Sequence, residues 1–240
     1  MKLDVLVFAS HPDDAELGMG GTIAKFVNSG VKVGIIDLTR GEMGTRGNEE
    51  IRKQEAENAS KILGISAREN LALPDGKLKL NDNYVSEVIK QIRHFRPQII
   101  FAPYFNDRHP DHIGTSRIVK EAFFFSGLKK IVTEYEGPIQ NPFRPNKIFY
   151  YMQYYEFTPS FICDISDTFE TKMKSIKAFS TQFFNENDKS DEPETFISQM
   201  NFTKFIEARA KYFGFKIGKD YGEPFFSEEE IELDLTDFVK

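Results

Sequence analysis

Short apolar runs alternate with helix-like segments through the first hundred residues. The apolar runs are nearly continuous, as is typical of strands covered on both faces of a parallel sheet. Gly30 and Gly64 follow two of the helix-like segments, and glycine commonly ends helices. The predicted strands are residues 3–10, 31–38, 70–73 and 99–102. The predicted helices are residues 22–28, 49–63 and 83–94.

This alternation predicts a fold class as well as its elements. Strands that alternate with helices form parallel sheets with helices on both faces, the doubly wound arrangement. We therefore expect an α/β protein with a Rossmann-like three-layer fold and a mainly parallel central sheet. A chain of 240 residues fits one such domain, so we expect residues 1–240 to form a single domain. No internal repeat is visible.

The second half of the chain, residues 126–240, is less regular than residues 1–125. Its pattern predicts one strand and two helices but no topology, and most of the 24 Phe residues of the chain lie in it. Such aromatic segments belong either to the core or to contacts between subunits. The polar stretch 183–192 is expected to be a loop over the functional site. The predicted strand is 147–152, the predicted helices are 166–178 and 194–212, and the Phe-rich segments are 123–125, 183–184 and 225–226.

Composition and charge exclude several classes of partner. Apolar residues make up 40% of the chain and charged residues 28%, which is ordinary for a globular protein with a core. With a net charge of -6, the protein is not expected to have the basic surface of nucleic-acid-binding proteins. No apolar stretch approaches the ~18 residues that span a bilayer. The apolar start is interrupted by Asp4, so no signal peptide is predicted. Cys163 is the single cysteine and is more consistent with a small buried side chain than with a reactive thiol. We therefore expect a cytoplasmic protein.

Histidines and aspartates gather in two segments that directly follow predicted strands. The sequence HPDD occupies residues 11–14, after the first strand, and HPDH occupies residues 109–112, after the strand at 99–102. Open α/β sheets bind their ligands at the carboxyl ends of the strands. Three of the four histidines lie in these segments, whereas His94 lies near a helix end and is expected to be a solvated or capping side chain.

Residue types in these segments favour a catalytic metal site. Two imidazoles and one carboxylate, from His11, Asp14 and His112, supply three protein ligands and leave a position open, as in catalytic zinc sites. Zinc makes water nucleophilic near neutral pH. We therefore expect one Zn²⁺ per subunit, with Fe²⁺ as the alternative because the same ligands accept it.

The remaining acidic and basic groups suggest proton transfer. Asp13 is predicted to be the general base that activates water. His109, held by Asp111 through a ring-nitrogen hydrogen bond, is predicted to stay protonated, to act as the acid and to stabilise the oxyanion or the leaving amine. The alternative is that these are turn residues, since Asp-Asp and His-Pro-Asp are common in turns. Two such segments at one edge of a sheet make turn chemistry alone the weaker interpretation.

The HPDD and HPDH segments, in this order and at these strand ends, resemble the LmbE-like or PIG-L family of N-acetylglucosaminyl deacetylases. Residues 38–47, 70–76 and 106–112 are further similar to the branch that deacetylates N-acetylglucosaminyl malate in bacillithiol biosynthesis. The resemblance implies that the first His, second Asp and last His bind zinc, and that the first Asp is the base. It also implies a small amino-sugar conjugate as substrate and a homo-oligomer, often a hexamer.

Substrate contacts are predicted from cations near the two segments. Arg46, Arg52 and Arg108 are suited to bidentate contact with the carboxylates of a malate glycoside. Glu42 is a candidate partner for a sugar hydroxyl or for the attacking water. Each of the four side chains is alternatively a surface or structural residue. A relative that acts on acetylated chitobiose or on an inositol conjugate would carry the same catalytic segments.

Three rival functions are less consistent with the sequence. A nucleotide-binding loop would need a third glycine where Ile23 stands, after Gly18 and Gly20. A non-haem iron oxygenase shares the ligand types but has no use for the proton-transfer groups Asp13 and His109. A non-enzymatic sugar-binding relative would be expected to lack one of those two groups. Hydrolysis of an acetylated amino sugar is therefore the predicted function.

Overall fold

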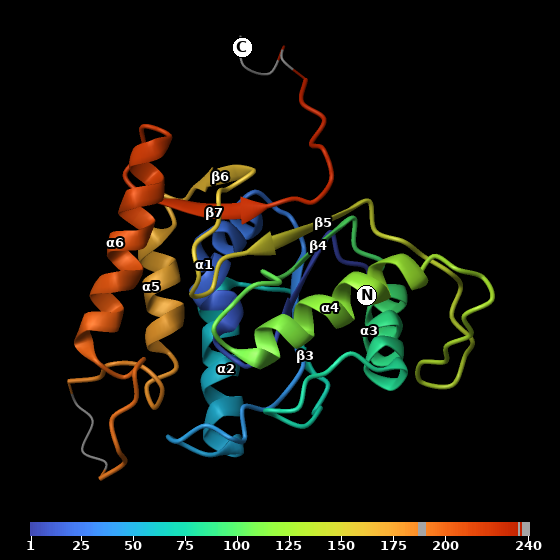
Figure 1. The fold of residues 1–240 in the computed structure, drawn as a ribbon, viewed down its shortest axis with the longest axis horizontal. Coiled ribbons are helices and arrows are strands. Elements are labelled where there is room, and N and C mark those ends of the chain that lie inside the picture. The colour runs from blue at the N-terminus through green and yellow to red at the C-terminus, as the bar shows by residue number, and fades with distance from the viewer. Residues whose placement is uncertain (187–190, 235, 237–240) are drawn as a thin grey trace.

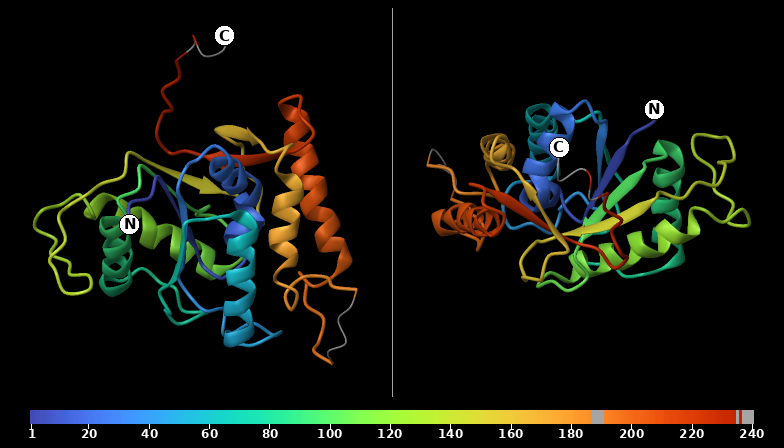
Figure 2. Two further views of the ribbon diagram at one scale, coloured as in Figure 1. Left: turned by 180° about the vertical axis from the view of Figure 1, so that it is seen from behind. Right: turned by 90° about the horizontal axis from the view of Figure 1, so that it is seen from above.

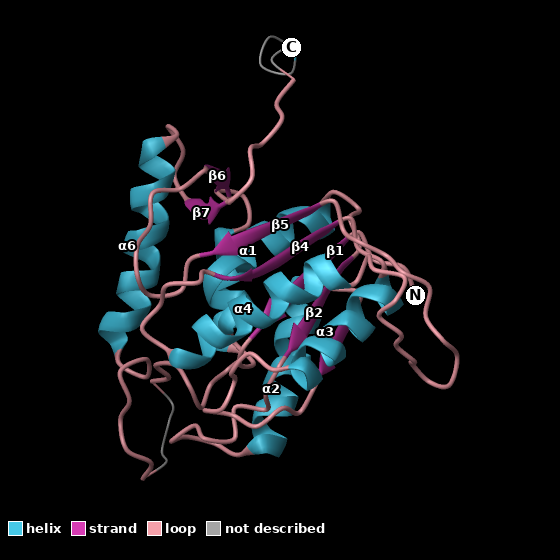
Figure 3. Cartoon of the chain, turned by 45° about the vertical axis from the view of Figure 1, so that its right-hand side comes forward, coloured by secondary structure: helices cyan, strands magenta, loops and turns pink. Residues whose placement is uncertain are grey.

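A mainly parallel sheet forms the centre of the computed structural model, which describes residues 1–186, 191–234 and 236. Across these residues seven strands pair in the order β3-β2-β1-β4-β5-β7-β6. Neighbours from β3 to β5 are parallel, and β7 is antiparallel to both β5 and β6. Figure 3 shows β5, β4, β1 and β2 side by side. The strands are β1 (Val5–Ala9), β2 (Val33–Asp37), β3 (Ala67–Asn70), β4 (Ile99–Pro103), β5 (Lys147–Tyr151), β6 (Phe161–Asp164) and β7 (Gly222–Phe226).

Helices cover both faces of this sheet (Figures 1 and 2). Alternate residues of β1 enter different cores: Leu6 and Phe8 pack with α3 and α4, whereas Val5 and Val7 pack with α1. The predicted three-layer α/β fold in a single domain is thus confirmed. The helices are α1 (Asp14–Asn28), α2 (Glu49–Leu63), α3 (Asp82–Phe95), α4 (Pro110–Phe125), α5 (Phe169–Lys177) and α6 (Met200–Lys216).

Helix α2 has the bounds that the sequence predicts, because both of its ends carry local signals. The Asn48 side chain accepts a hydrogen bond from the backbone N–H of Ile51, which caps the amino end. Gly64 adopts a left-handed conformation with φ 70° at the carboxyl end. Helix α3 is capped in the same way by Asn81.

Helix α1 begins eight residues before its predicted start, at Asp14 instead of residue 22. Its glycines permit close packing: a Cβ at Gly18 would lie 2.2 Å from the ring of Tyr151. Tertiary packing therefore outweighs the low helix propensity of glycine. The helix is broken at Met19, where φ is -149° and ψ is 24°.

Residues from the far end of the chain complete this break. The buried Glu223 carboxylate, in β7, accepts the backbone N–H groups of Gly21 at 3.0 Å and Thr22 at 2.7 Å. Lys172, in α5, pairs with the same carboxylate and donates to the carbonyl of Leu17 at 2.9 Å. The orphan backbone groups on both sides of the break are thus satisfied by the second half of the chain.

Two other elements of the first half differ from the prediction. Strand β3 covers Ala67–Asn70 instead of residues 70–73, because the pairing partner of Asn70 is Asp37, the last residue of β2. Helix α4 was not predicted, since its sequence has small and polar residues where a core-facing stripe is expected. Gly114 allows it to approach the chain closely: a Cβ there would lie 1.7 Å from the carbonyl oxygen of Leu78.

The second half adds the antiparallel end of the sheet and two helices. Strand β5 and helices α5 and α6 were predicted approximately, whereas β6 and β7 were not. Helix α6 begins at Met200 instead of residue 194, because residues 195–198 form a turn. In this turn the hydroxyl of Ser198 accepts the N–H of Thr195 and the hydroxyl of Thr195 accepts the N–H of Ser198.

The Phe-rich segments divide between core and surface. Phe183 and Phe225 are buried in the core, whereas Phe124 is 53% exposed. Of the polar stretch 183–192, residues 187–190 lie outside the described residues; Glu192 at its end accepts the N–H of Gly47 at 3.0 Å. Within the part of the chain that the structure describes, none of the helices has the length and apolar character needed to cross a membrane.

Candidate active site

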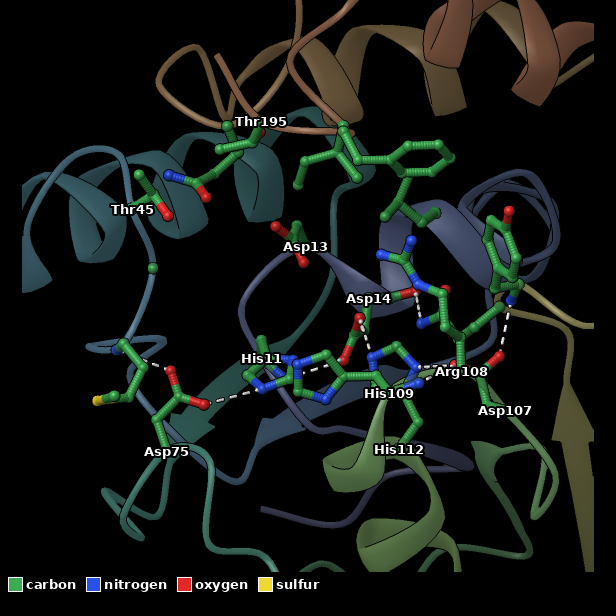
Figure 4. A pocket seen from close by; sticks show the side chains of 18 of the residues that line it. His11, Asp13, Asp14, Thr45, Asp75, Asp107, Arg108, His109, His112 and Thr195 are labelled. Carbon is green, nitrogen blue, oxygen red and sulfur yellow. Dashed lines mark hydrogen bonds and ion pairs between the residues drawn. The ribbon is translucent and has the colours of Figure 1, made fainter. Parts of the chain in front are cut away.

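A cavity of about 420 Å³ lies at the carboxyl edge of the sheet, between the segments that follow β1 and β4. These two strands are neighbours at the centre of the sheet, where the order of connections reverses. Five of the six predicted metal-binding and catalytic residues line this cavity, and Figure 4 shows them. They are His11, Asp13, Asp14, His109 and His112.

Asp14 is fixed in place by backbone hydrogen bonds. Its Oδ2 atom accepts the N–H groups of Ser10 at 3.0 Å and His11 at 2.9 Å. Its Oδ1 atom lies 3.2 Å from Nε2 of His112. Burial acts to raise the pKa of Asp14, but the adjacent rings of His112 and His11 outweigh it and hold that pKa well below the usual value. Asp14 therefore faces the cavity as a carboxylate.

Asp13 is buried and its backbone is strained. Its φ of 122° lies in a region that non-glycine residues rarely adopt, and such strain is commonly found at functional sites. Burial raises the pKa of Asp13 to about 7, against the positive charge of Arg52, which lowers it. A carboxyl group with this pKa can accept a proton near neutral pH.

Arg52 is engaged with Asp13 and its surroundings. Its Nη2 atom donates to Oδ2 of Asp13 at 3.0 Å and to the carbonyl of Pro12. Its Nη1 atom donates to the side chain of Gln182 at 3.3 Å. The substrate contact predicted for Arg52 stays a prediction; the observed contacts indicate that it orients Asp13.

The other predicted substrate residues are distributed differently. Arg108 lines the cavity, with its guanidinium carbon 4.8 Å from the ring centres of both Tyr154 and Phe196. Arg46 is buried and donates to the carbonyl of Thr181 at 2.7 Å. Glu42 accepts the backbone N–H of Asp75 at 2.8 Å. Arg46 and Glu42 thus support the loops around the cavity and are not among its lining residues.

His109 is held differently from the prediction. Its Nδ1 atom accepts the backbone N–H of Asp111 at 3.2 Å, so the Asp111 carboxylate is not its partner. The reason is that His109 is the N-cap residue of α4, with Pro110 in the first turn. The carboxylate of Asp111 instead accepts the N–H groups of Gly76 at 2.7 Å and Leu78 at 3.0 Å.

Two aspartates that the sequence analysis did not single out contact the histidines. Oδ1 of Asp107 lies 2.7 Å from Nδ1 of His112, and Oδ1 of Asp75 lies 3.0 Å from Nε2 of His11. Figure 4 shows Asp75 and Asp107 on opposite sides of the cluster. Asp107 belongs to the same loop as His112, a proximity that could have indicated it, whereas Asp75 lies in a separate segment that follows β3.

The donor set fits a divalent transition metal. Nitrogen atoms of His11, His109 and His112 lie within 4.8 Å of one another, and Asp14 faces two of these rings. Imidazole and carboxylate donors of this kind suit zinc. The contacts of His11 and His112 with Asp75 and Asp107 are of the type that orients histidine ligands from outside the metal shell.

The opposite wall of the cavity comes from the second half of the chain. Tyr154, Phe196 and Phe202 line it, and ring centres of successive residues in this order lie 5.7 Å and 5.5 Å apart. Gln182 and Gln153 supply amide groups, and Gln153 donates to the carbonyl of Asp14 at 3.0 Å. We refer to Tyr154, Phe196 and Phe202 below as the aromatic wall.

Comparison with known proteins agrees with this geometry. The family model of PIG-L, GlcNAc-PI de-N-acetylase, matches residues 6–123. A diacetylchitobiose deacetylase of Thermococcus kodakarensis is 30% identical over 231 residues, which cover 91% of this chain and 80% of the relative. The chain belongs to the PIG-L family. It is accordingly a metal-dependent amidohydrolase with N-deacetylase activity, and the PIG-L family is zinc-dependent.

Two further matches agree with membership of the PIG-L family. The crystal structure of a conserved protein, TT1542, from Thermus thermophilus superposes with a TM-score of 0.86, is 38% identical and covers 97% of both chains. A probable N-acetyl-alpha-D-glucosaminyl L-malate deacetylase 2 of Bacillus subtilis is 33% identical over 137 residues, or 52% of this chain and 62% of the relative. The relatives that the chain matches are therefore named for different acetylated amino sugars.

Proposed function

We propose that the chain removes the N-acetyl group of a small amino-sugar conjugate at this cavity, with a zinc ion held by His11, Asp14 and His112. The observation that carries the proposal is the buried, strained Asp13 beside converging imidazole and carboxylate donors. Zinc would supply a Lewis acid that makes water nucleophilic near neutral pH. Fe²⁺ suits the same donors and is the alternative metal.

Asp13 would act as the general base. Its pKa of about 7 lets it take a proton from the attacking water at neutral pH and hold it for transfer to the leaving amine. Arg52, at 3.0 Å, keeps the carboxylate in one orientation and favours its ionised form. Fixed groups of this kind reduce the reorganisation needed during the reaction.

His109 would donate a hydrogen bond to the oxygen that becomes negative. The leaving amine would take its proton from Asp13, because burial and the neighbouring rings of His11 and His112 lower the pKa of His109 and favour its neutral form. Because its Nδ1 atom accepts a backbone hydrogen bond, the neutral ring carries its proton on Nε2. That N–H is the group available for donation into the cavity. Asp111 would contribute indirectly, because its carboxylate ties the segment 76–78 to the loop and lies 3.4 Å from Nε2 of His11.

For the substrate, a chitobiose-like disaccharide has more support than the malate conjugate. The Thermococcus relative matches 91% of this chain, whereas the Bacillus relative matches 52% of it. The aromatic wall offers apolar ring faces to a second sugar. The malate conjugate of bacillithiol biosynthesis is the second candidate, favoured by Arg108, whose guanidinium could receive a carboxylate at the cavity.

The test is amine release by the zinc-loaded protein from diacetylchitobiose, N-acetylglucosaminyl malate and N-acetylglucosamine, each with a chelated control. Chelator-sensitive release from diacetylchitobiose, several-fold faster than from the other two, is expected. Preference for the malate conjugate would support the second candidate. No release from any of the three would refute the proposed substrate class. The cytoplasmic location and the homo-oligomeric or hexameric state stay predictions from the sequence.

A further inference from the structure

Both oxygen atoms of the Asp107 carboxylate accept hydrogen bonds from the residues around the cavity. It is 5% exposed and lies in the loop between β4 and α4. Oδ1 contacts Nδ1 of His112 at 2.7 Å and accepts the backbone N–H of His109 at 3.0 Å. Oδ2 accepts the backbone N–H groups of Tyr154 at 2.8 Å and Tyr155 at 3.3 Å. One buried side chain therefore joins a candidate metal ligand to the aromatic wall.

The contact with His112 determines which ring nitrogen is available to a metal. A carboxylate only accepts hydrogen bonds, so the Nδ1 atom of His112 must carry a proton. In the neutral ring, the lone pair is then on Nε2, which lies 3.2 Å from Oδ1 of Asp14. Two acceptor atoms that face each other at this distance need a cation between them, which is either a second proton on the ring or a metal ion.

The second oxygen atom holds the opposite side of the cavity. Tyr154 follows β5 by three residues, and its ring stacks against Arg108 and lies 5.7 Å from Phe196. The N–H of Tyr154 is bonded to Asp107, so the segment after β5 cannot move relative to His112 without loss of a partly buried, charge-assisted hydrogen bond. The candidate metal ligand His112 and Tyr154 of the aromatic wall are thus held by the same carboxylate.

From these contacts we infer that Asp107 is a positioning residue, which fixes the tautomer and direction of His112 for the metal and holds Tyr154 at the cavity. The inference rests on the metal site of the proposed function. Histidine ligands that lose such a partner typically lose about 10- to 100-fold in metal affinity. The effect on the metal does not require that Asp107 touch either the substrate or the ion.

A purely local role can be separated from this one. Asp107 forms a turn in which its Oδ1 atom accepts the N–H of the residue two positions later, at 3.0 Å. Asp164 forms the same turn with the N–H of Ser166, also at 3.0 Å, in a part of the chain that does not line the cavity. Asparagine retains such turns, but its single oxygen atom cannot serve both His112 and Tyr154.

The experiment compares Asp107→Asn with the matched control Asp164→Asn. Each metal-free variant is titrated with Zn²⁺ in competition with a chromophoric chelator, and folding is followed by circular dichroism. Asp107→Asn is expected to bind Zn²⁺ about 10- to 100-fold more weakly than the wild type, with Asp164→Asn unchanged. Wild-type affinity in a folded Asp107→Asn protein, or an equal loss in the control, would overturn the inference.

A second measurement does not depend on whether the Asp107→Asn protein folds. In the zinc-loaded wild type, the protected imidazole N–H of His112 is observed by ¹⁵N-edited NMR and assigned by its absence in His112→Gln. A proton on Nδ1 is expected, and a proton on Nε2 would contradict the inference. Neither readout uses a substrate, so a protein that binds Zn²⁺ normally and hydrolyses no acetylated sugar would refute the proposed function and leave this inference standing.

Discussion

The two halves of the chain contribute different things to one cavity. Polar groups of the first half, such as Asp14 and His112, are held by short hydrogen bonds and are mostly shielded from solvent. The aromatic wall of the second half is open by comparison, with Phe196 47% exposed and Tyr154 36% exposed. Groups that react need fixed geometry, whereas groups that select a substrate need only a surface of suitable shape.

The comparison explains why family membership does not identify the substrate. The PIG-L model ends at residue 123, before any residue of the aromatic wall. What the family shares is therefore the half that carries the metal donors and the proposed base. The aromatic wall, which we propose contacts the part of the substrate beyond the acetamido sugar, lies outside that model. We expect substitutions in the two halves to change different kinetic constants.

The largest expected effect tests the first half. Replacing His112 with Ala removes a candidate metal ligand, so metal content should fall from one equivalent to near zero and deacetylation to background. Metal analysis and amine release measure both. The control is His94→Ala, which removes a histidine whose ring contacts those of Phe95 and Tyr135, away from the cavity, and should leave both metal content and activity unchanged. Full metal content in His112→Ala would contradict the ligand assignment.

A second substitution in the first half separates chemistry from metal binding. Asp13→Asn removes the proposed base, which should reduce kcat by about 10²- to 10⁴-fold while the metal content stays at one equivalent. Steady-state kinetics and metal analysis on the same sample test this. Equal loss of metal in Asp13→Asn and His112→Ala would show that the two residues do not have separate roles.

A smaller effect is expected in the second half. Phe196→Ala removes one face of the aromatic wall and one ring beside Arg108, an interaction of about 0.5–1.5 kcal/mol. The expected result is a KM several-fold higher with kcat within about twofold of the wild type. Phe215→Ala, at an 83% exposed ring on α6, is the matched control. A large fall in kcat for Phe196→Ala would break the division between the halves.

The smallest expected effect is a shift in pH dependence. Asp13 must be deprotonated to act, so kcat/KM should decrease as the pH falls through its pKa, which burial raises to about 7 and a bound cation lowers. The positive charge of Arg52 also lowers that pKa. Arg52→Gln should therefore move the acid limb of the profile to higher pH by about one unit, and Arg52→Lys by less. Identical acid limbs in all three proteins would exclude this coupling.

How much of the site could be predicted depended on how local its signals are. The HPDD and HPDH segments follow buried strands, and neighbouring strands bring their loops together, so the convergence of His11, Asp14 and His112 on one cavity was predictable. The hydrogen-bond partners were not. The buried position of Arg52 beside Asp13 depends on how α2 packs, and the backbone bond to His109 depends on the unpredicted start of α4.

The second half could not be predicted for a different reason. Strand β7 lies between β5 and β6 in the sheet although it follows both in the sequence. It pairs with β5 over only two residue pairs and with β6 over four. Short antiparallel pairings of this kind leave little periodicity to detect. The aromatic wall therefore became visible only once the topology had placed Tyr154 and Phe196 against the first-half loops.

The bonds of Glu223 to Gly21 and Thr22 have a consequence for synthesis on the ribosome. Helix α1 begins with Asp14 and leaves the ribosome early, but the carboxylate that satisfies its central break follows about 200 residues later. Until β7 has been translated, these N–H groups lack the partner that they have in the folded protein, and closing the core without it would cost about 1–3 kcal/mol for each group. The break in α1 is therefore expected to reach its final form only when translation is nearly complete, although its residues are among the first to be made.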